Sequence, residues 1–184
     1  LYQESKQLLK EIQSDDDLKI LTIEADIKEL EQNLDTFYLL TNEITNYILL
    51  KGFKDFGNTG EMRVHAHNLE EVNKLPLSYL LMMRRYEKDF IIRGEKKYSD
   101  RFYDKYRKNR SYVLNSGNID QLTKQYILQE LDAYKQNFDK LLMYTNIIGD
   151  KNNTGLYAKL NKITHLLQTE FTNLKAKADT AKSS

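Results

Sequence analysis

The sequence predicts an all-α protein built as an elongated helical bundle. Helix-breaking residues are rare, because the 184 residues include seven Gly and a single Pro. These residues divide the chain into long uninterrupted stretches, as helix punctuation does. Within the stretches, apolar residues recur every three or four positions, and no comparable stretch alternates as a strand would.

Three stretches keep this apolar repeat over several turns, which is typical of the seam of a bundle or coiled coil. The first runs through Ile20, Ile23, Ile27, Leu30, Leu34, Phe37, Thr41, Ile44 and Ile48. The second runs through Ile127, Leu131, Tyr134, Phe138, Leu141, Thr145 and Ile148. The third, with one extra residue at Phe171, runs through Leu156, Leu160, Ile163, Leu167, Phe171, Leu174 and Ala178.

We expect seven helices, at residues 3–13, 18–51, 60–74, 77–93, 96–114, 118–148 and 153–180. Ser14 with the acidic run 15–17 would cap the second helix and supply an acidic first turn. Pro76 stands just before the fourth helix, where its missing N–H costs little. The second and sixth helices would be about 50 Å and about 45 Å long at the rise of an α-helix. Helices of that length fit an elongated bundle.

Composition excludes several classes of site. Lys plus Arg number 28 and Asp plus Glu 27, so the formal net charge is +1 and gives no general attraction to nucleic acid or to an anionic membrane. Cysteine is absent, which excludes disulfides, thiolate metal sites and a cysteine nucleophile. No apolar run approaches the ~20 residues of a membrane-spanning helix, so we expect the chain as given to be soluble. It begins at Leu1 without a signal-peptide pattern, and we interpret it as a fragment of a longer protein.

Two segments match each other at an offset of 98 residues, with the pattern G-x2-[GA]-x-[ML]-[RN]-x3-H-x2-[EQ]. The first copy comprises Gly57, Gly60, Met62, Arg63, His67 and Glu70. The second comprises Gly155, Ala158, Leu160, Asn161, His165 and Gln168. Each copy follows a long heptad stretch and opens a new helix. The match indicates two helical hairpins built on one plan, or else two Gly-opened helix starts that each hold a hydrogen-bonded His.

The segment 77–93 places cations on an apolar face. On a helical wheel, Arg84 and Lys88 fall in the middle of the arc that holds its Leu and Ile residues. A buried charge must be paired, or it costs several kcal/mol. Because Glu87 and Asp89 point elsewhere on the wheel, the partners would be acids on another helix or a bound anion. A third possibility is that the two side chains extend to the bundle surface.

A bound carboxylate suits Arg84, because the planar guanidinium donates two parallel hydrogen bonds. Arg63 and His67, four residues apart on the preceding helix, would face the same space.

Other chemistries have weaker support. His67 and Glu71 have i,i+4 spacing, but two ligands alone are a poor metal signal. The basic and aromatic segment 95–110 resembles a nucleic-acid surface, although a solvated face over an aromatic core stripe fits the balanced charge better.

The run Arg84-Arg85-Tyr86-Glu87-Lys88-Asp89-Phe90-Ile91-Ile92-Arg93-Gly94, followed by Tyr98, resembles the R-R-x-E-K-D-F-[LI]-x-R signature of the helical bimodular sensor domain. Met62-Arg63-x3-His67-x2-Glu70 resembles the L-R-x3-H-x2-E stretch of the same family. Tyr134-x3-Phe138, then Ile148-Gly149 and Gly155-Leu156, follow in the family's order. The resemblance covers the chain from about residue 20 to 175.

This resemblance implies two stacked four-helix modules that share long helices. It implies the extracytoplasmic, periplasmic ligand sensor of a bacterial chemoreceptor or sensor histidine kinase. Such domains typically bind small organic acids, and some sense through a periplasmic binding-protein partner. They work as homodimers anchored by two flanking transmembrane helices, and the present chain is shorter than we expect for the family.

The sequence therefore favours a single sensor domain over residues 1–184 that binds a ligand and is not an enzyme. The expected ligand-binding residues are Arg63, His67, Arg84, Lys88 and Arg85. We expect no catalytic residues, no metal, no cofactor and no nucleic-acid partner. The alternative from another class is a structural or adaptor bundle, in which internal acids pair with Arg84 and Lys88 and leave no cavity.

Overall fold

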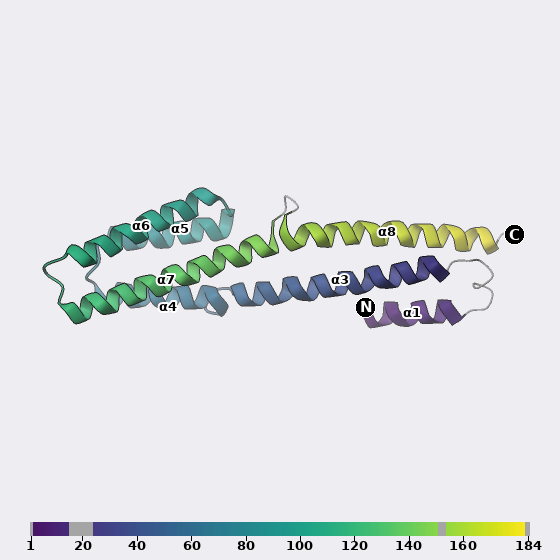
Figure 1. Cartoon of the computed structure of the whole chain (residues 1–184), viewed down its shortest axis with the longest axis horizontal. Helices are drawn as coiled ribbons and strands as arrows, with labels where there is room; N and C mark the ends of the chain where they lie inside the picture. The colour runs from purple at the N-terminus through teal and green to yellow at the C-terminus, as the bar shows by residue number, and fades with distance from the viewer. Residues whose placement is uncertain (1, 15–23, 151–153, 183–184) are drawn as a thin grey trace. The chain divides into compact units, whose positions relative to one another are not determined.

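The computed structural model describes residues 2–14, 24–150 and 154–182, and in these ranges it contains seven α-helices and no β-strand (Figure 1). The helices are α1 (Tyr2–Ser14), α3 (Glu24–Lys51), α4 (Gly57–Val72), α5 (Leu77–Arg93), α6 (Lys96–Asn115), α7 (Gln121–Ile148) and α8 (Gly155–Lys182). The all-α prediction is confirmed.

The helix ends follow the expected punctuation with small shifts. Pro76 is the N-cap of α5 and Gly94, in the left-handed conformation, is its C-cap. Helix α4 begins at Gly57, three residues before the predicted start. Asp120, which the sequence reading did not single out, caps α7 by accepting a hydrogen bond of 2.9 Å from the Thr123 N–H. Ser14, the predicted cap of the second helix, is the last residue of α1. The acidic run 15–17 and the predicted helical residues 18–23 and 153 lie outside the described residues.

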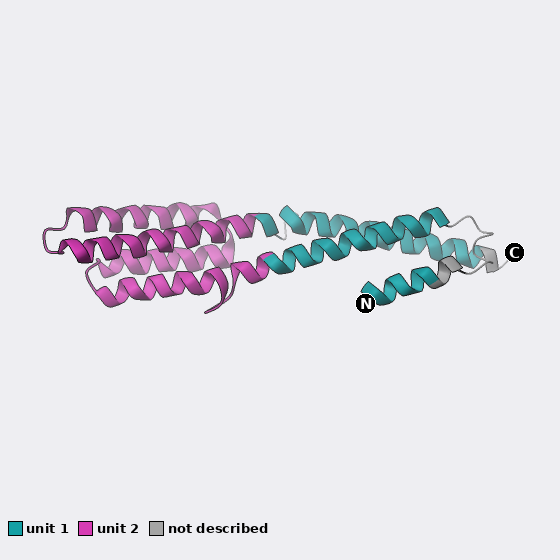
Figure 2. Cartoon of the chain, turned by 60° about the horizontal axis from the view of Figure 1, so that its bottom comes forward, with its two compact units in different colours: residues 1–46, 147–184 teal, residues 47–146 magenta. Residues whose placement is uncertain are grey.

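The chain divides into two compact units (Figure 2). Unit 1 comprises residues 1–46 and 147–184, and unit 2 comprises residues 47–146. The divisions fall inside α3 and α7, so each of these helices contributes to both units. Unit 2 is a four-helix arrangement of α4, α5, α6 and most of α7. The described part of unit 1 contains three helices, namely α1, most of α3 and α8.

The core of unit 2 forms around the predicted seam of α7. The five α7 side chains in this core are fully buried; they are Ile127, Leu131, Tyr134, Phe138 and Leu141. Side chains from α4, α5 and α6 complete the same apolar cluster. Phe102 of α6 stacks on Phe138 at a ring-centroid distance of 3.8 Å, and this pair lies at the centre of several edge-to-face contacts.

The core of unit 1 is smaller and uses the predicted seam of α3. Ile27, Leu30 and Leu34 pack with Leu9 of α1 and Leu167 of α8. Polar contacts surround this core, including hydrogen bonds from the Lys6 ammonium to Glu31 at 3.1 Å and to Asp35 at 2.8 Å. The seam prediction is wrong at three described positions, because Thr41, Ile48 and Phe171 are exposed. Heptad spacing identifies one side of a helix, but it does not show whether another helix covers each position on that side.

The repeat detected in the sequence corresponds to two glycine-bounded junctions. Gly52 (φ +76°) follows α3 and Gly57 (φ +63°) opens α4, while Gly149 (φ +82°) follows α7 and Gly155 (φ +57°) opens α8. In both junctions the two glycines are in close contact: a Cβ on Gly57 would lie 2.7 Å from Gly52 Cα, and one on Gly155 would lie 2.7 Å from Gly149 N. Left-handed backbone and missing space both require glycine here.

We predict that Gly52→Ala strongly destabilises unit 2. The new Cβ would lie 2.0 Å from the Phe56 carbonyl oxygen and would adopt a left-handed φ. We expect the free energy of unfolding to fall by at least about 2 kcal/mol in urea titrations. Gly117→Ala is the control, because Gly117 has open space and no positive φ. Equal effects of the two substitutions would contradict this account.

Candidate functional site

The face of helix α5 that packs on the core differs from the face predicted from the arc of Leu and Ile residues on the helical wheel. Its buried residues are Leu80, Met83, Glu87 and Phe90, whereas Leu77, Leu81 and Ile92 are exposed. The inward face is therefore rotated by roughly one residue, about 100°, from the predicted arc. The inward-facing cation pair is a wrong prediction in this respect, because Lys88 is half exposed and Arg84 lies only partly buried at the edge of the core.

The observed inward face of α5 includes a buried carboxylate. Only 3% of the Glu87 side chain is exposed, and it accepts hydrogen bonds from the Tyr134 hydroxyl and, at 2.7 Å, from the Lys88 ammonium. Burial, and then the negative charge of Glu87, raise the pKa of Tyr134 well above its usual value. The expectation that Glu87 points away from Lys88 is thus wrong. Two donors compensate the desolvation of this carboxylate.

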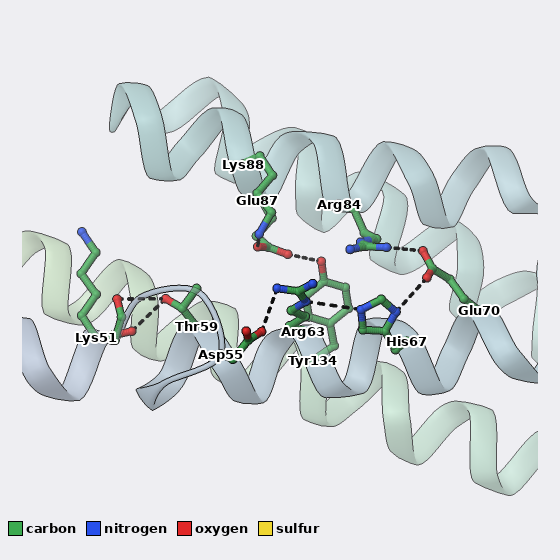
Figure 3. Close-up of polar contacts among 11 residues, drawn as sticks. Lys51, Asp55, Thr59, Arg63, His67, Glu70, Arg84, Glu87, Lys88 and Tyr134 are labelled. Atoms are coloured by element: carbon green, nitrogen blue, oxygen red, sulfur yellow. Dashed lines mark hydrogen bonds and ion pairs between the residues drawn. The ribbon is translucent and has the colours of Figure 1, made fainter.

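A second carboxylate, that of Glu70, lies between two of the predicted ligand-binding residues (Figure 3). Helix α4 carries Arg63, His67 and Glu70 at i, i+4 and i+7, a spacing that puts them on one side of the helix. Glu70 Oε1 accepts a hydrogen bond from Arg84 Nη1 of α5, and Glu70 Oε2 lies 3.2 Å from His67 Nδ1. One carboxylate therefore joins a guanidinium and an imidazole from two helices.

The row of polar contacts continues along α4 toward the first glycine junction. Arg63 donates from Nε to His67 Nε2 at 3.4 Å and from Nη1 to Asp55 Oδ1 at 2.7 Å. These contacts fit a neutral His67 whose proton is on Nδ1, since Nε2 accepts from Arg63 and Nδ1 faces Glu70. We call the five residues the α4–α5 polar row: Asp55, Arg63, His67, Glu70 and Arg84 (Figure 3).

The structure brings together three of the five predicted residues, Arg63, His67 and Arg84. Lys88 lies one turn beyond Arg84 on α5 and bonds to Glu87. Arg85 stands apart from the row, because it is largely exposed and its nearest acid is Asp89 on its own helix, at 3.8 Å. All five predicted residues thus lie near internal acids, as the structural alternative expected for Arg84 and Lys88.

The sequence reading did not assign site roles to Asp55, Glu70, Glu87 or Tyr134. Glu70 could have been predicted from the sequence. It stands three residues after His67 in the repeat, and residues three apart are neighbours on a helix surface. Glu87 and Tyr134 are 47 residues apart, and only the packing of α5 on α7 brings them together.

A neighbouring polar cluster was also missed. Glu130 of α7 is buried and lies 2.8 Å from His65 Nδ1, and it accepts a hydrogen bond of 2.9 Å from Asn68 Nδ2. His65 therefore faces α7, whereas His67 faces Glu70.

The four aromatic residues of segment 95–110 lie on the core side of α6: Tyr98 and Phe102 are buried, and Tyr103 and Tyr106 pack against the core.

Comparisons with protein-family models, curated proteins and solved structures found no match. In residues 2–14, 24–150 and 154–182, no group of three or more His, Cys, Asp or Glu side chains is placed to hold a metal ion. No helix in the described part of the chain is long and apolar enough to cross a membrane. The candidate site is consequently defined by its own geometry, as a row of cations and carboxylates between α4 and α5.

We predict that Tyr134→Phe destabilises unit 2 and changes its response to alkali. The variant leaves the buried Glu87 carboxylate without one donor, so the free energy of unfolding should fall by about 1–3 kcal/mol at pH 7. Above pH 10 the unfolded tyrosine ionises while the folded one keeps its proton. The wild type therefore loses up to about 1.4 kcal/mol per pH unit from this residue, and the variant does not.

Urea titrations at pH 7, 10 and 11 measure both effects. Tyr126→Phe is the control, since Tyr126 is exposed on the same helix. A gap between wild type and Tyr134→Phe that stays constant or widens above pH 10 would contradict the assignment.

Proposed function

We propose that the chain is the ligand-binding sensor domain of a transmembrane signalling receptor, a chemoreceptor or a histidine kinase, and that it recognises a small organic acid at the α4–α5 polar row. The observation that supports this proposal is the position of the Glu70 carboxylate between Arg84 and His67. Arg63, in turn, contacts His67. A carboxylate already fits this place, and the carboxylate of a ligand has the same charge and the same acceptor geometry.

The exposure of the row suits a reversible site. About a quarter of each of the Arg84 and Glu70 side chains, and about half of Arg63 and His67, is exposed. Water and a small solute can reach these groups, while partial burial reduces the screening of their charges. In this proposal the ligand carboxylate takes the place of Glu70, and Lys88, one turn along α5, contacts a second acidic or hydroxyl group of the ligand.

Ligand exchange at Glu70 also supplies a signal. In the absence of ligand, Glu70 ties α4 to α5 through Arg84. When a diffusible carboxylate replaces it, the direct ion pair between α4 and α5 becomes a contact bridged by the ligand, and the two helices can shift by an ångström or so. We also propose the cellular context that the family resemblance implies. The domain is periplasmic, it is flanked by membrane spans, and it works as a homodimer.

A second candidate function is a structural or adaptor bundle, and one observation favours it. All five predicted site residues lie within ion-pair or hydrogen-bond reach of internal carboxylates, which are Asp55, Glu70, Asp89 and Glu87. In that case the α4–α5 polar row stabilises the fold, and its side chains contact only one another. A sensor that binds a periplasmic protein in place of a small molecule is the remaining alternative.

We predict that organic acids stabilise the wild type and that Arg84→Ala abolishes the effect. Acetate, succinate, malate and citrate are screened by thermal shift. Ligand at a hundredfold excess over Kd adds about 2.7 kcal/mol, which raises Tm by about 5 °C or more for a chain of this size. Arg85→Ala is the matched control on the same helix, and it should respond like the wild type. Equal responses of Arg84→Ala and the wild type would show that the α4–α5 polar row is not the binding site.

We further predict that Glu70→Gln tightens acid binding by about tenfold, measured by calorimetry, because the internal competitor loses its charge. The adaptor hypothesis predicts the opposite. It expects Glu70→Gln to lower Tm by leaving Arg84 and His67 unpaired, without any gain of acid binding. The same variant therefore separates the two functions.

A further inference from the structure

The junction between α3 and α4 exposes two phenylalanines at its tip. Phe53 is 73% exposed and Phe56 is 63% exposed. Burial of such a side chain contributes about 1.5–3 kcal/mol, so a chain that leaves two of them in water forgoes that stabilisation. Paired exposed aromatic side chains are typical of interaction sites. We call residues 52–57 the aromatic loop.

The aromatic loop is held in one conformation by several independent contacts. Phe53 and Phe56 exchange two backbone hydrogen bonds, at 3.0 and 3.1 Å. Thr59 Oγ1 donates to the Lys51 carbonyl at 2.9 Å, and the Asp55 carboxylate pairs with Arg63. The left-handed glycines at its two ends pack against each other. A loop that is already ordered loses little entropy on binding, so its exposed side chains are effective anchors.

The second junction has left-handed, closely packed glycines without an aromatic residue between them. Gly149 and Gly155 close it with the same left-handed, closely packed glycines, and Thr154 Oγ1 donates to Asp150 at 2.9 Å. Between these glycines the sequence is Asp-Lys-Asn-Asn-Thr, without an aromatic residue. Close packing of left-handed glycines therefore does not require aromatic residues between them, and the phenylalanines of the first copy need another explanation.

The charge around the aromatic loop is positive. In the part of the chain that the structure describes, neither Lys51 nor Lys54 has an acid within ion-pair distance, and Lys54 Nζ lies 5.3 Å from the centre of the Phe53 ring. The one acid of the loop, Asp55, is paired with Arg63. Partial burial lowers the pKa of Lys51, which has already lost part of its hydration. Pairing a carboxylate with Lys51 would therefore remove less water from the ammonium group than pairing it with a fully exposed lysine.

We propose that the aromatic loop is a docking site for a partner protein that offers an apolar pocket bordered by carboxylates. Phe53 and Phe56 fill the pocket, and Lys51 and Lys54 pair with its acidic border. A preformed, rigid shape favours a complementary protein pocket over a fluid bilayer, and the Asp55 carboxylate at the tip disfavours an anionic membrane. This inference does not depend on acid binding at the α4–α5 polar row.

The first experiment is photo-crosslinking in cells of the source organism, from the full-length protein. The photoreactive phenylalanine analogue p-benzoylphenylalanine is placed at position 53, at position 56 or at the control position 122, where Leu122 is 79% exposed. We expect one protein to be crosslinked from positions 53 and 56 and not from 122. A crosslink to lipid, a crosslink to a second copy of this chain, or no crosslink above the control would overturn the proposal.

The second experiment measures affinity with that protein after purification. The double variant Phe53→Asn, Phe56→Asn carries the polar type of residue found in the second junction, and we expect it to bind at least 30-fold more weakly with an unchanged Tm. Lys51→Glu, Lys54→Glu keeps both rings and should weaken binding at least tenfold at low salt. Arg84→Ala should bind like the wild type. Full affinity in both double variants would overturn the proposal.

Discussion

The fully buried seam of α7 is the constraint on which unit 2 depends. Its apolar side chains form the centre of the core, and the polar residues beside them make contacts with each of the other three helices. Glu130 and the Asn137 carbonyl contact α4, the Tyr134 hydroxyl contacts α5, and Asp132 and Asp139 accept from tyrosines of α6. Because one helix positions the three others, a change along α7 affects every surface of the unit.

The hydrogen bond from Tyr134 to Glu87 makes the observed rotation of α5 possible. Leu80, Met83 and Phe90 turn this face of α5 inward, and the Tyr134 hydroxyl and the Lys88 ammonium supply the donors that the buried Glu87 carboxylate on the same face needs. That rotation exposes Lys88 to water and brings Arg84 to the border with α4, where it meets Glu70. The geometry of the candidate site is therefore a consequence of a core contact that lies behind it.

The helices were predictable because heptad spacing and rare glycines are local signals, and the described helices follow them closely. The glycine repeat was equally readable, because Gly57 and Gly155 supply left-handed backbone that other residues rarely adopt. The face of α5 was not predictable in this way. A wheel that counts only Leu and Ile cannot include a buried Glu87, whose partner is 47 residues away. Likewise, the sequence supplied Arg63, His67 and Arg84 as candidates, but only tertiary packing identifies Glu70 as the carboxylate between them.

In the proposed sensor, Glu70 occupies the place of a ligand carboxylate. The most direct measurement is a high-resolution crystal structure of the protein with whichever organic acid binds most tightly. We predict that the acid's carboxylate lies within about 3 Å of both Arg84 and His67, with the Glu70 side chain turned away. An acid bound elsewhere, with Glu70 still joined to Arg84 and His67, would contradict the central claim.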